Sequence, residues 1–172
     1  MDTIQSYAKS LAKDLRDLIP QSFVPPSDGV KSKTEMVLAN SFVKNTRGYI
    51  ERVVQQINGS FEQGWYDCCA VMIRRLLETL IIESFEKYGI ASKIKDTRTN
   101  DFFFLSELIP LTLSEASWNL SRNTKQAMPK LKSIGDLSAH CRRYNAHRSD
   151  IDNITQDLRV VTQELIYLAG LK

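Results

Sequence analysis

Hydrophobic and polar positions follow one another along much of the chain at the three- or four-residue spacing of an α-helix face. The broadest apolar stretch runs from Trp65 to Tyr88, where hydrophobic side chains recur on more than one side of the expected helix. A helix that is apolar around most of its circumference is surrounded by other elements. We therefore predict that a helix over about residues 60–88 is the core of an all-α domain.

Three further stretches carry a single apolar stripe and predict helices over residues 33–57, 134–145 and 149–168. The polar run Asn58-Gly59-Ser60 predicts the end of the first of these helices. No internal repeat and no convincing pair of strands is present. The pattern favours a bundle over any sheet-containing fold.

Residues 90–133 are less regular. The polar stretch 90–101 predicts a loop, and Phe102-Phe103-Phe104-Leu105 begins a short buried segment that Pro110 ends. Ser114 is a suitable N-cap for another short helix. Pro129 predicts the start of a helix or a break in one.

The N-terminal region reads differently from the rest. An apolar stripe predicts a helix over residues 2–19, and the proline-containing stretch 20–32 predicts a linker. We expect residues 1–32 to form an N-terminal helix and linker, and residues 33–172 to form the bundle domain. The predicted fold is an all-α bundle of about five to seven helices, from which the N-terminal helix can be detached.

Composition adds few constraints. The 172 residues carry 23 Lys and Arg against 20 Asp and Glu, a net charge of +3 that permits nucleic-acid contact without arguing for it. The three cysteines, Cys68, Cys69 and Cys141, are odd in number and lack a Cys-x-x-Cys spacing, which favours a reducing cytoplasm over a disulfide framework. No signal peptide and no apolar run of membrane-spanning length is present, so we expect no membrane contact.

The richest polar stretch covers residues 135–148 and contains both histidines of the protein. On a continuous helix Asp136, His140 and His147 share one face, together with Arg143 or Tyr144. Asp136 is then placed to orient the His140 imidazole, and Arg143 to bind a phosphate as a fork. The alternative is an i,i+4 pair of Asp136 and His140 with the arginines as a solvated face.

A second cluster, Arg74-Arg75 with Glu78, lies on the core helix. Two arginines amid apolar neighbours need a partner, and Glu78 at i+3 from Arg75 predicts a structural ion pair. If this cluster faces residues 135–148, Arg75 becomes a candidate phosphate-binding residue. The histidines and one aspartate make no tight metal-ligand set, and no phosphate loop or nucleophile–base pattern occurs, so neither a metal nor a cofactor is expected.

Two phrases together resemble the HEPN superfamily. They are WYDCCAVMIRRLLE (residues 65–78) and IGDLSAH (residues 134–140), followed by a long C-terminal helix. The chain is similar, over roughly residues 35–170, to bacterial HEPN-like proteins of unknown function. The resemblance implies an α-helical bundle that is often a homodimer, and a metal-independent ribonuclease activity found in defence, toxin–antitoxin or RNA-processing systems.

The HEPN motif is an arginine, a polar residue, several variable residues and a histidine. Transferred here, His140 is the catalytic histidine and Asp136 the polar residue, but Gly135 stands where the motif expects arginine. That departure weighs against cleavage. A second match is Arg142 with His147. On a continuous helix these residues, five positions apart, would point about 140° away from each other, so the match requires a helix end between them.

Two classes of function follow. The first is a domain that binds or cleaves RNA or nucleotides, with His140, Asp136, Arg142 and His147 as catalytic candidates. Its phosphate-binding candidates are Arg143, Arg148 and Arg75. The second is a non-catalytic module that forms a homodimer or docks a protein partner.

Overall fold

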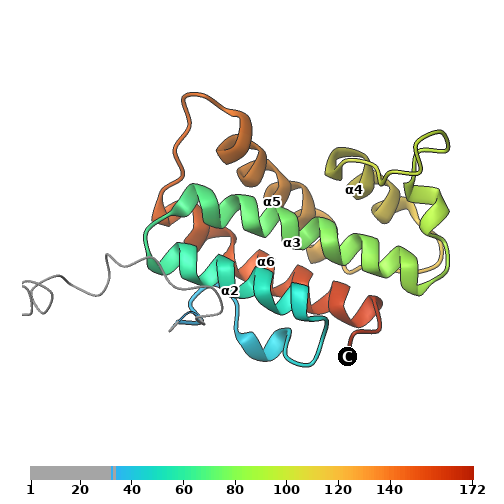
Figure 1. Cartoon of the computed structure of the whole chain (residues 1–172), viewed down its shortest axis with the longest axis horizontal. Coiled ribbons are helices and arrows are strands. Elements are labelled where there is room, and N and C mark those ends of the chain that lie inside the picture. Colours follow the sequence, from blue (N-terminus) through green and yellow to red (C-terminus); the bar gives the residue numbers. More distant parts are fainter. Residues whose placement is uncertain (1–31, 33) are drawn as a thin grey trace, which may run out of the picture. The chain divides into compact units, whose positions relative to one another are not determined.

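Helices supply the regular structure of residues 32 and 34–172, which are the residues that the computed structural model describes (Figure 1). The α-helices are α2 (Gly48–Glu62), α3 (Tyr66–Lys87), α4 (Leu105–Ser114), α5 (Arg122–His140) and α6 (Arg148–Leu168), and the 3-10 turns are η2 (Asn40–Phe42) and η3 (Ala91–Ile94). Within this part of the chain the one β-type contact is an isolated bridge between Lys95 and Phe102. The all-α prediction is confirmed. The predicted helix over residues 2–19 lies outside the described residues.

The central position of α3 is also confirmed. α3 packs against α2, α5 and α6, and the shorter α4 lies against α3 and α5 (Figure 1). The buried apolar residues of α3 lie on both sides of its stripe and are Cys69, Ala70, Ile73, Leu76, Leu77, Leu80, Ile81 and Phe85. α3 begins at Tyr66 rather than near Ser60, because Gly64 with a φ of 75° separates it from α2. Gly89, with a φ of 68°, follows its C-terminus as predicted.

The prediction of a helix from residue 33 is wrong, since α2 begins only at Gly48. The preceding segment buries Val37 and Leu38 and fastens its backbone to the side chain of Asn58. The Asn58 Oδ1 accepts the N–H groups of Val37 and Leu38 at 3.2 and 3.1 Å, and its Nδ2 donates to the Leu38 carbonyl at 2.7 Å. These bonds replace the partners that a helix would provide, so the apolar residues are buried in a non-helical segment.

The same asparagine explains the missed end of α2. Asn58-Gly59-Ser60 does not end the helix, which continues to Glu62. Asn58 is fully buried there as a hydrogen-bonding residue, so its polarity marks a tertiary contact and no turn.

Pro110 and Pro129 lie inside α4 and α5, whereas each was expected to end or start a helix. A proline removes one helical hydrogen bond, but burial of its neighbours can outweigh that loss. Ile109 precedes Pro110 and Met128 precedes Pro129, and both side chains are buried. Tertiary packing therefore holds both helices together across their prolines.

The segment before α5 corrects two smaller predictions. Phe104 is 76 % exposed and is the N-cap of α4, so the run of aromatic residues at 102–104 is not wholly buried. Ser114 is the last residue of α4 rather than an N-cap. The N-cap of α5 is Ser121, whose Oγ accepts the N–H of Thr124 at 3.2 Å.

At the C-terminal end α6 is close to its predicted bounds, but α5 ends at His140 instead of near Asn145. The seven residues between the helices form a loop, seen at the upper left of Figure 1. Among the helices described, none has both the length and the apolar character needed to cross a membrane.

Candidate functional site

α5 approaches α3 very closely at Gly135. A Cβ added to Gly135 would lie 2.5 Å from the Cβ of Arg74 and 3.0 Å from the carbonyl oxygen of Ala70. Real Cβ atoms do not approach that closely, so only glycine fits without moving one helix. We name the contact formed by Ala70, Arg74, Gly135 and Asp136, together with the ion-pair partners Glu78 and Lys132, the α3–α5 seam. The residue that stands in place of the expected arginine therefore has a packing role.

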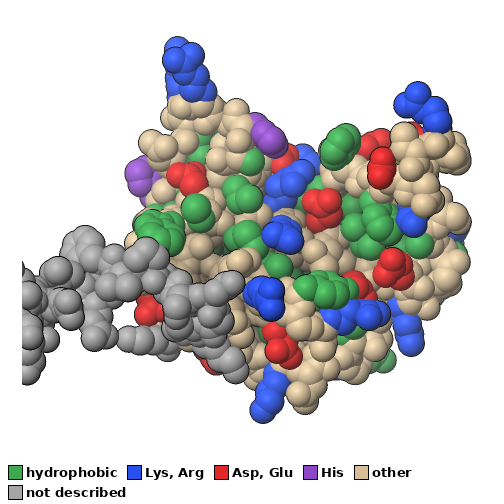
Figure 2. All heavy atoms as spheres, viewed as in Figure 1, with side chains coloured by type: hydrophobic (Ala, Val, Ile, Leu, Met, Phe, Trp, Pro, Cys, Tyr) green, Lys and Arg blue, Asp and Glu red, His purple; other side chains and the backbone are tan. Residues whose placement is uncertain are grey.

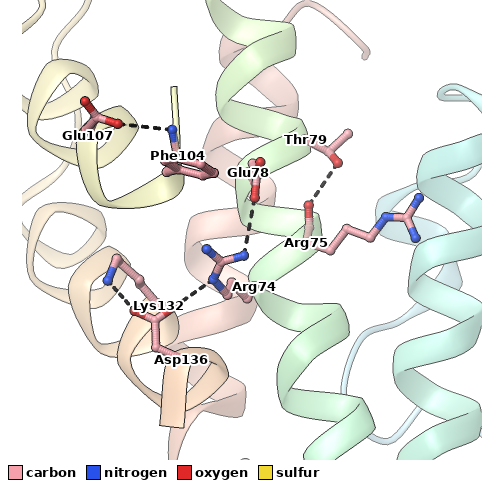
Figure 3. Close-up of polar contacts among 8 residues, drawn as sticks. All are labelled: Arg74, Arg75, Glu78, Thr79, Phe104, Glu107, Lys132 and Asp136. Carbon is pink, nitrogen blue, oxygen red and sulfur yellow. Dashed lines mark hydrogen bonds and ion pairs between the residues drawn. The ribbon is translucent and has the colours of Figure 1, made fainter. Parts of the chain in front are cut away.

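The same close approach brings an arginine to Asp136 from the other helix. The Arg74 Nε donates to the Asp136 Oδ1 at 2.8 Å, and the Arg74 Nη1 lies 3.5 Å from Glu78 (Figure 3). The ammonium of Lys132, one turn earlier on α5, donates to the Oδ2 of Asp136. The seam thus carries two cations and two carboxylates, whose formal charges cancel.

Arg75 does not take part in this cluster, so the predicted pairing of Arg75 with Glu78 is wrong. Figure 3 shows the Arg75 side chain pointing away from Asp136, on the side of α3 opposite α5. The partner of Glu78 is instead Arg74, four positions earlier on the same helix, a spacing that brings two side chains together on one face. Arg75 is exposed and lies apart from the other candidate residues.

Asp136 does not orient His140 through a hydrogen bond, contrary to prediction. Its two oxygens instead accept from Arg74 and Lys132. Burial alone would raise the pKa of Asp136, but the hydrogen bonds and charges of Lys132 and Arg74 outweigh it and lower that pKa below its usual range. His140, the last residue of α5, is exposed, and its ring has no hydrogen-bond or ion-pair partner within the described part of the chain.

The loop that follows His140 is held by two carboxylates, one from α3 and one from α6. The Asp67 Oδ1, in the first turn of α3, accepts the N–H of Ala146 at 3.0 Å. The Asp150 Oδ2 accepts both the N–H of His147 at 2.8 Å and the hydroxyl of Tyr144 at 3.1 Å. Burial raises the pKa of Tyr144, and so do the bond to Asp150 and the charge of Asp67. Both carboxylates are thus directed at the loop backbone and Tyr144.

We name residues 140–148 the basic segment. It contains three arginines, two histidines and no acidic residue. Arg142 and Arg143 are exposed, and neither guanidinium makes an ion pair with a described residue. Figure 2 shows Lys and Arg side chains projecting from the tip of this lobe, with the two histidines as separate patches on it. The basic segment is the strongest concentration of unneutralised positive charge among the candidate residues.

His147 and Arg148 lie at the start of α6. His147 is the N-cap residue and exposed, whereas Arg148 approaches Asp152 at 3.5 Å and lies over the ring of Phe61 at 5.3 Å. Arg142 and His147 both fall in the non-helical stretch after α5, so no helical phase separates them. Their expected pairing is compatible with the loop, but no bond joins them.

An open groove of about 700 Å³ lies between α4 and the C-terminal half of α5. Its walls are mainly apolar and include Ile109, Pro110, Leu113 and Leu137. Lys132, Asp136, His140 and Cys141 also line it. The hollow is visible in Figure 2 between the lobe of the basic segment and α4. The groove therefore joins the seam to the start of the basic segment.

These partners differ in how far the sequence indicates them. Lys132 and Asp136 have an i,i+4 spacing that indicates a pair, and Arg74 was recognised as needing a partner. Asp67 carries no such signal, because it lies 79 residues from its partner Ala146.

No group of His, Cys, Asp or Glu among the described residues is arranged to hold a metal ion. All three cysteines fall within the described part of the chain and are free thiols. Burial raises the pKa of the Cys69 thiol to about 12, which makes it an unreactive core residue.

Comparisons with protein-family models, curated proteins and solved structures find no match to this chain. The chemistry of the basic segment and the groove is therefore inferred from their own side chains.

Proposed function

We propose that this chain is a HEPN-like domain that binds RNA or a nucleotide through the basic segment. The observation that carries the proposal is that Arg142 and Arg143 are exposed, and have no acidic partner among the described residues, on a loop that is already held in place. Phosphate contacts with arginine dominate affinity for nucleic acid. A fixed loop loses less conformational freedom on binding than a mobile one.

The seam is a poorer phosphate site than the basic segment. Arg74 donates to Asp136, but its charge and that of Lys132 are already neutralised by the carboxylates of Asp136 and Glu78. A phosphate placed there would meet two carboxylates. The cation that the HEPN motif requires beside His140 is therefore better supplied by Arg142 or Arg143, which lie two and three positions after it in the chain.

Fluorescence anisotropy with a labelled single-stranded RNA of mixed sequence tests the proposal. We expect the R142A/R143A double variant to lose at least about tenfold in affinity at low salt. We also expect its slope of log affinity against log salt to shrink by about 0.7 for each lost phosphate contact. An exposed pair elsewhere, R52A/R98A, is the matched control and should change little. Equal losses in the two double variants, or no binding by the wild type, would refute this site.

Cleavage is a separate property and has a separate test. The purified chain is incubated with the same RNA in the presence of a chelator, and the products are resolved on a gel. If His140 acts as acid–base, H140A abolishes cleavage and H147A does not. If the Arg142–His147 pair acts, the outcome is reversed. Undiminished cleavage by the H140A/H147A double variant excludes both assignments.

A homodimerisation module is the second candidate, and exposed aromatic side chains favour it. Phe104 is 76 % exposed and Tyr167 is 80 % exposed, at the start of α4 and near the end of α6. Large exposed hydrophobics are enriched at protein interfaces. Light scattering after size exclusion should show a dimer that F104S or Y167S converts to a monomer; a monomeric wild type would reject this candidate.

A further inference from the structure

The groove between α4 and α5 has features that the proposed phosphate contacts do not use. Its volume of about 700 Å³ is that of a pocket for a small molecule, and its walls are largely apolar. Lys132, Asp136, His140 and Cys141 are among the residues that line it. Arg142 is the next residue along the chain. A ligand held by Arg142 or Arg143 is therefore bound one or two positions along the chain from the groove residue Cys141.

We propose that this groove binds an unstacked guanine base of the ligand whose phosphates the basic segment holds. The inference deepens, and rests on, the proposed function. Single-stranded RNA is read by proteins that splay its bases out and bond to their Watson–Crick edges. An apolar groove provides the surface for the base, and the charged pair in it provides the edge contacts.

The charged pair has free bonding capacity. A carboxylate offers about four acceptor positions, two on each oxygen. Within the described part of the chain, Arg74 uses one on the Oδ1 of Asp136 and Lys132 uses one on the Oδ2, which leaves one position on each oxygen. Lys132 has three N–H donors, of which this pair occupies one. The Asp136 side chain is 30 % exposed and lines the groove, so these positions can be reached.

Guanine matches this pattern and the other bases do not. Its N1–H and N2–H groups are adjacent donors that can address the two oxygens of Asp136, and its O6 is an acceptor for Lys132. Adenine and cytosine present one amino donor beside a ring acceptor, and uracil presents one N–H between two acceptors. Each of these bases would leave a carboxylate oxygen facing another acceptor or no donor. Because two cations hold Asp136 ionised, it acts only as an acceptor.

The test compares three fluorescein-labelled heptanucleotides, UUUGUUU, UUUAUUU and UUUUUUU, by anisotropy. One bidentate pair between a side chain and a base discriminates against the wrong base by about fivefold or more. We therefore expect the guanine oligonucleotide to bind at least about fivefold more tightly than the adenine one. D136N should bring that ratio close to one, because an amide presents a donor to one of the two guanine N–H groups.

A second variant avoids the ion pairs. Ser133 is exposed and lines the groove from α5, so S133W fills the space without removing a charge. It should abolish the preference for guanine while the all-uridine oligonucleotide binds as before. Q126W, at an exposed position of α5 outside the groove, is the matched control and should keep the wild-type ratio.

The outcomes separate the two proposals. If all three oligonucleotides bind the wild type equally, the guanine site is wrong and the phosphate-binding function stands. If the wild type prefers guanine but S133W keeps that preference as Q126W does, the base lies elsewhere and the groove is excluded as its site. If none of the oligonucleotides binds, both proposals fail together.

Discussion

The α3–α5 seam and the basic segment use the same kinds of side chain in opposite ways. In the seam, Arg74 and Lys132 are paired with carboxylates, and Gly135 lets the two helices meet. In the basic segment, Arg142 and Arg143 are exposed and the nearby carboxylates bond to the loop instead. Asp136 of the seam and His140 of the basic segment are only four positions apart in the chain. Charge that is neutralised at a helix contact supports structure, whereas charge that is left over on a fixed loop is available to a ligand.

The largest effect should come from adding one methyl group to the seam. G135A places a Cβ 2.5 Å from that of Arg74, so we expect a loss of about 2 kcal/mol in the free energy of unfolding. Urea denaturation measures this loss. G59A, inside α2 with nothing within 4 Å of the added Cβ, is the control and should stabilise by about 0.5 kcal/mol. Equal stability of G135A and wild type would show that the helices can separate without cost.

Next in size is the removal of the seam's carboxylate. D136N leaves Arg74 and Lys132 with a weaker acceptor, and we expect a loss of about 1 kcal/mol at neutral pH. Because the folded state lowers the pKa of Asp136, the stabilisation is present above the ordinary pKa of 3.8 and is lost as the pH falls through the lowered value.

The difference between wild type and D136N should therefore shrink in unfolding experiments below pH 3.8. D157N removes the exposed pair with Lys130, so it should cost only a few tenths of a kcal/mol at any pH. A D136N deficit that persists unchanged into acid would show that its cause is not the carboxylate charge.

A smaller loss in the free energy of unfolding is expected when the hydrogen bond between α3 and the loop is removed. D67A removes the acceptor of the Ala146 N–H, which should cost about 0.5–1 kcal/mol. It should also weaken RNA binding a few-fold, since the loop must then be ordered on binding. D67N keeps an oxygen acceptor and should restore most of both properties. If D67A binds RNA as the wild type does, the fixed geometry of the loop has no role in recognition.

The smallest effect on stability should come from the two exposed arginines. R142A/R143A removes no ion pair with a described residue, so the free energy of unfolding should stay within about 0.5 kcal/mol of wild type. Thermal and urea unfolding check this, alongside the binding assay. A large destabilisation would mean that these arginines are structural, and the contrast with the seam would disappear.

Much of the fold is predictable because helical periodicity is local. The stripe of α6 and the broad apolar surface of α3 each identify a helix and its buried face within one stretch of sequence. The predictions that were wrong involve residues whose partners lie far away. Asn58 indicates a turn until its bonds to Val37 and Leu38 are seen, and Pro129 indicates a helix break until its buried neighbours are known.

The sequence by itself determined an all-α chain, a central helix at α3 and a stretch near residues 135–148 that collects both histidines and three arginines. Tertiary structure alone decided which charged side chains are neutralised by a partner and which are left exposed. Arg74 meets Asp136 across 62 positions, and Asp67 meets Ala146 across 79. Such pairings depend on how closely two helices approach, and here a single Cβ would prevent that approach at Gly135. Spacing along the chain reports the face of a helix, but only packing reports what that face touches.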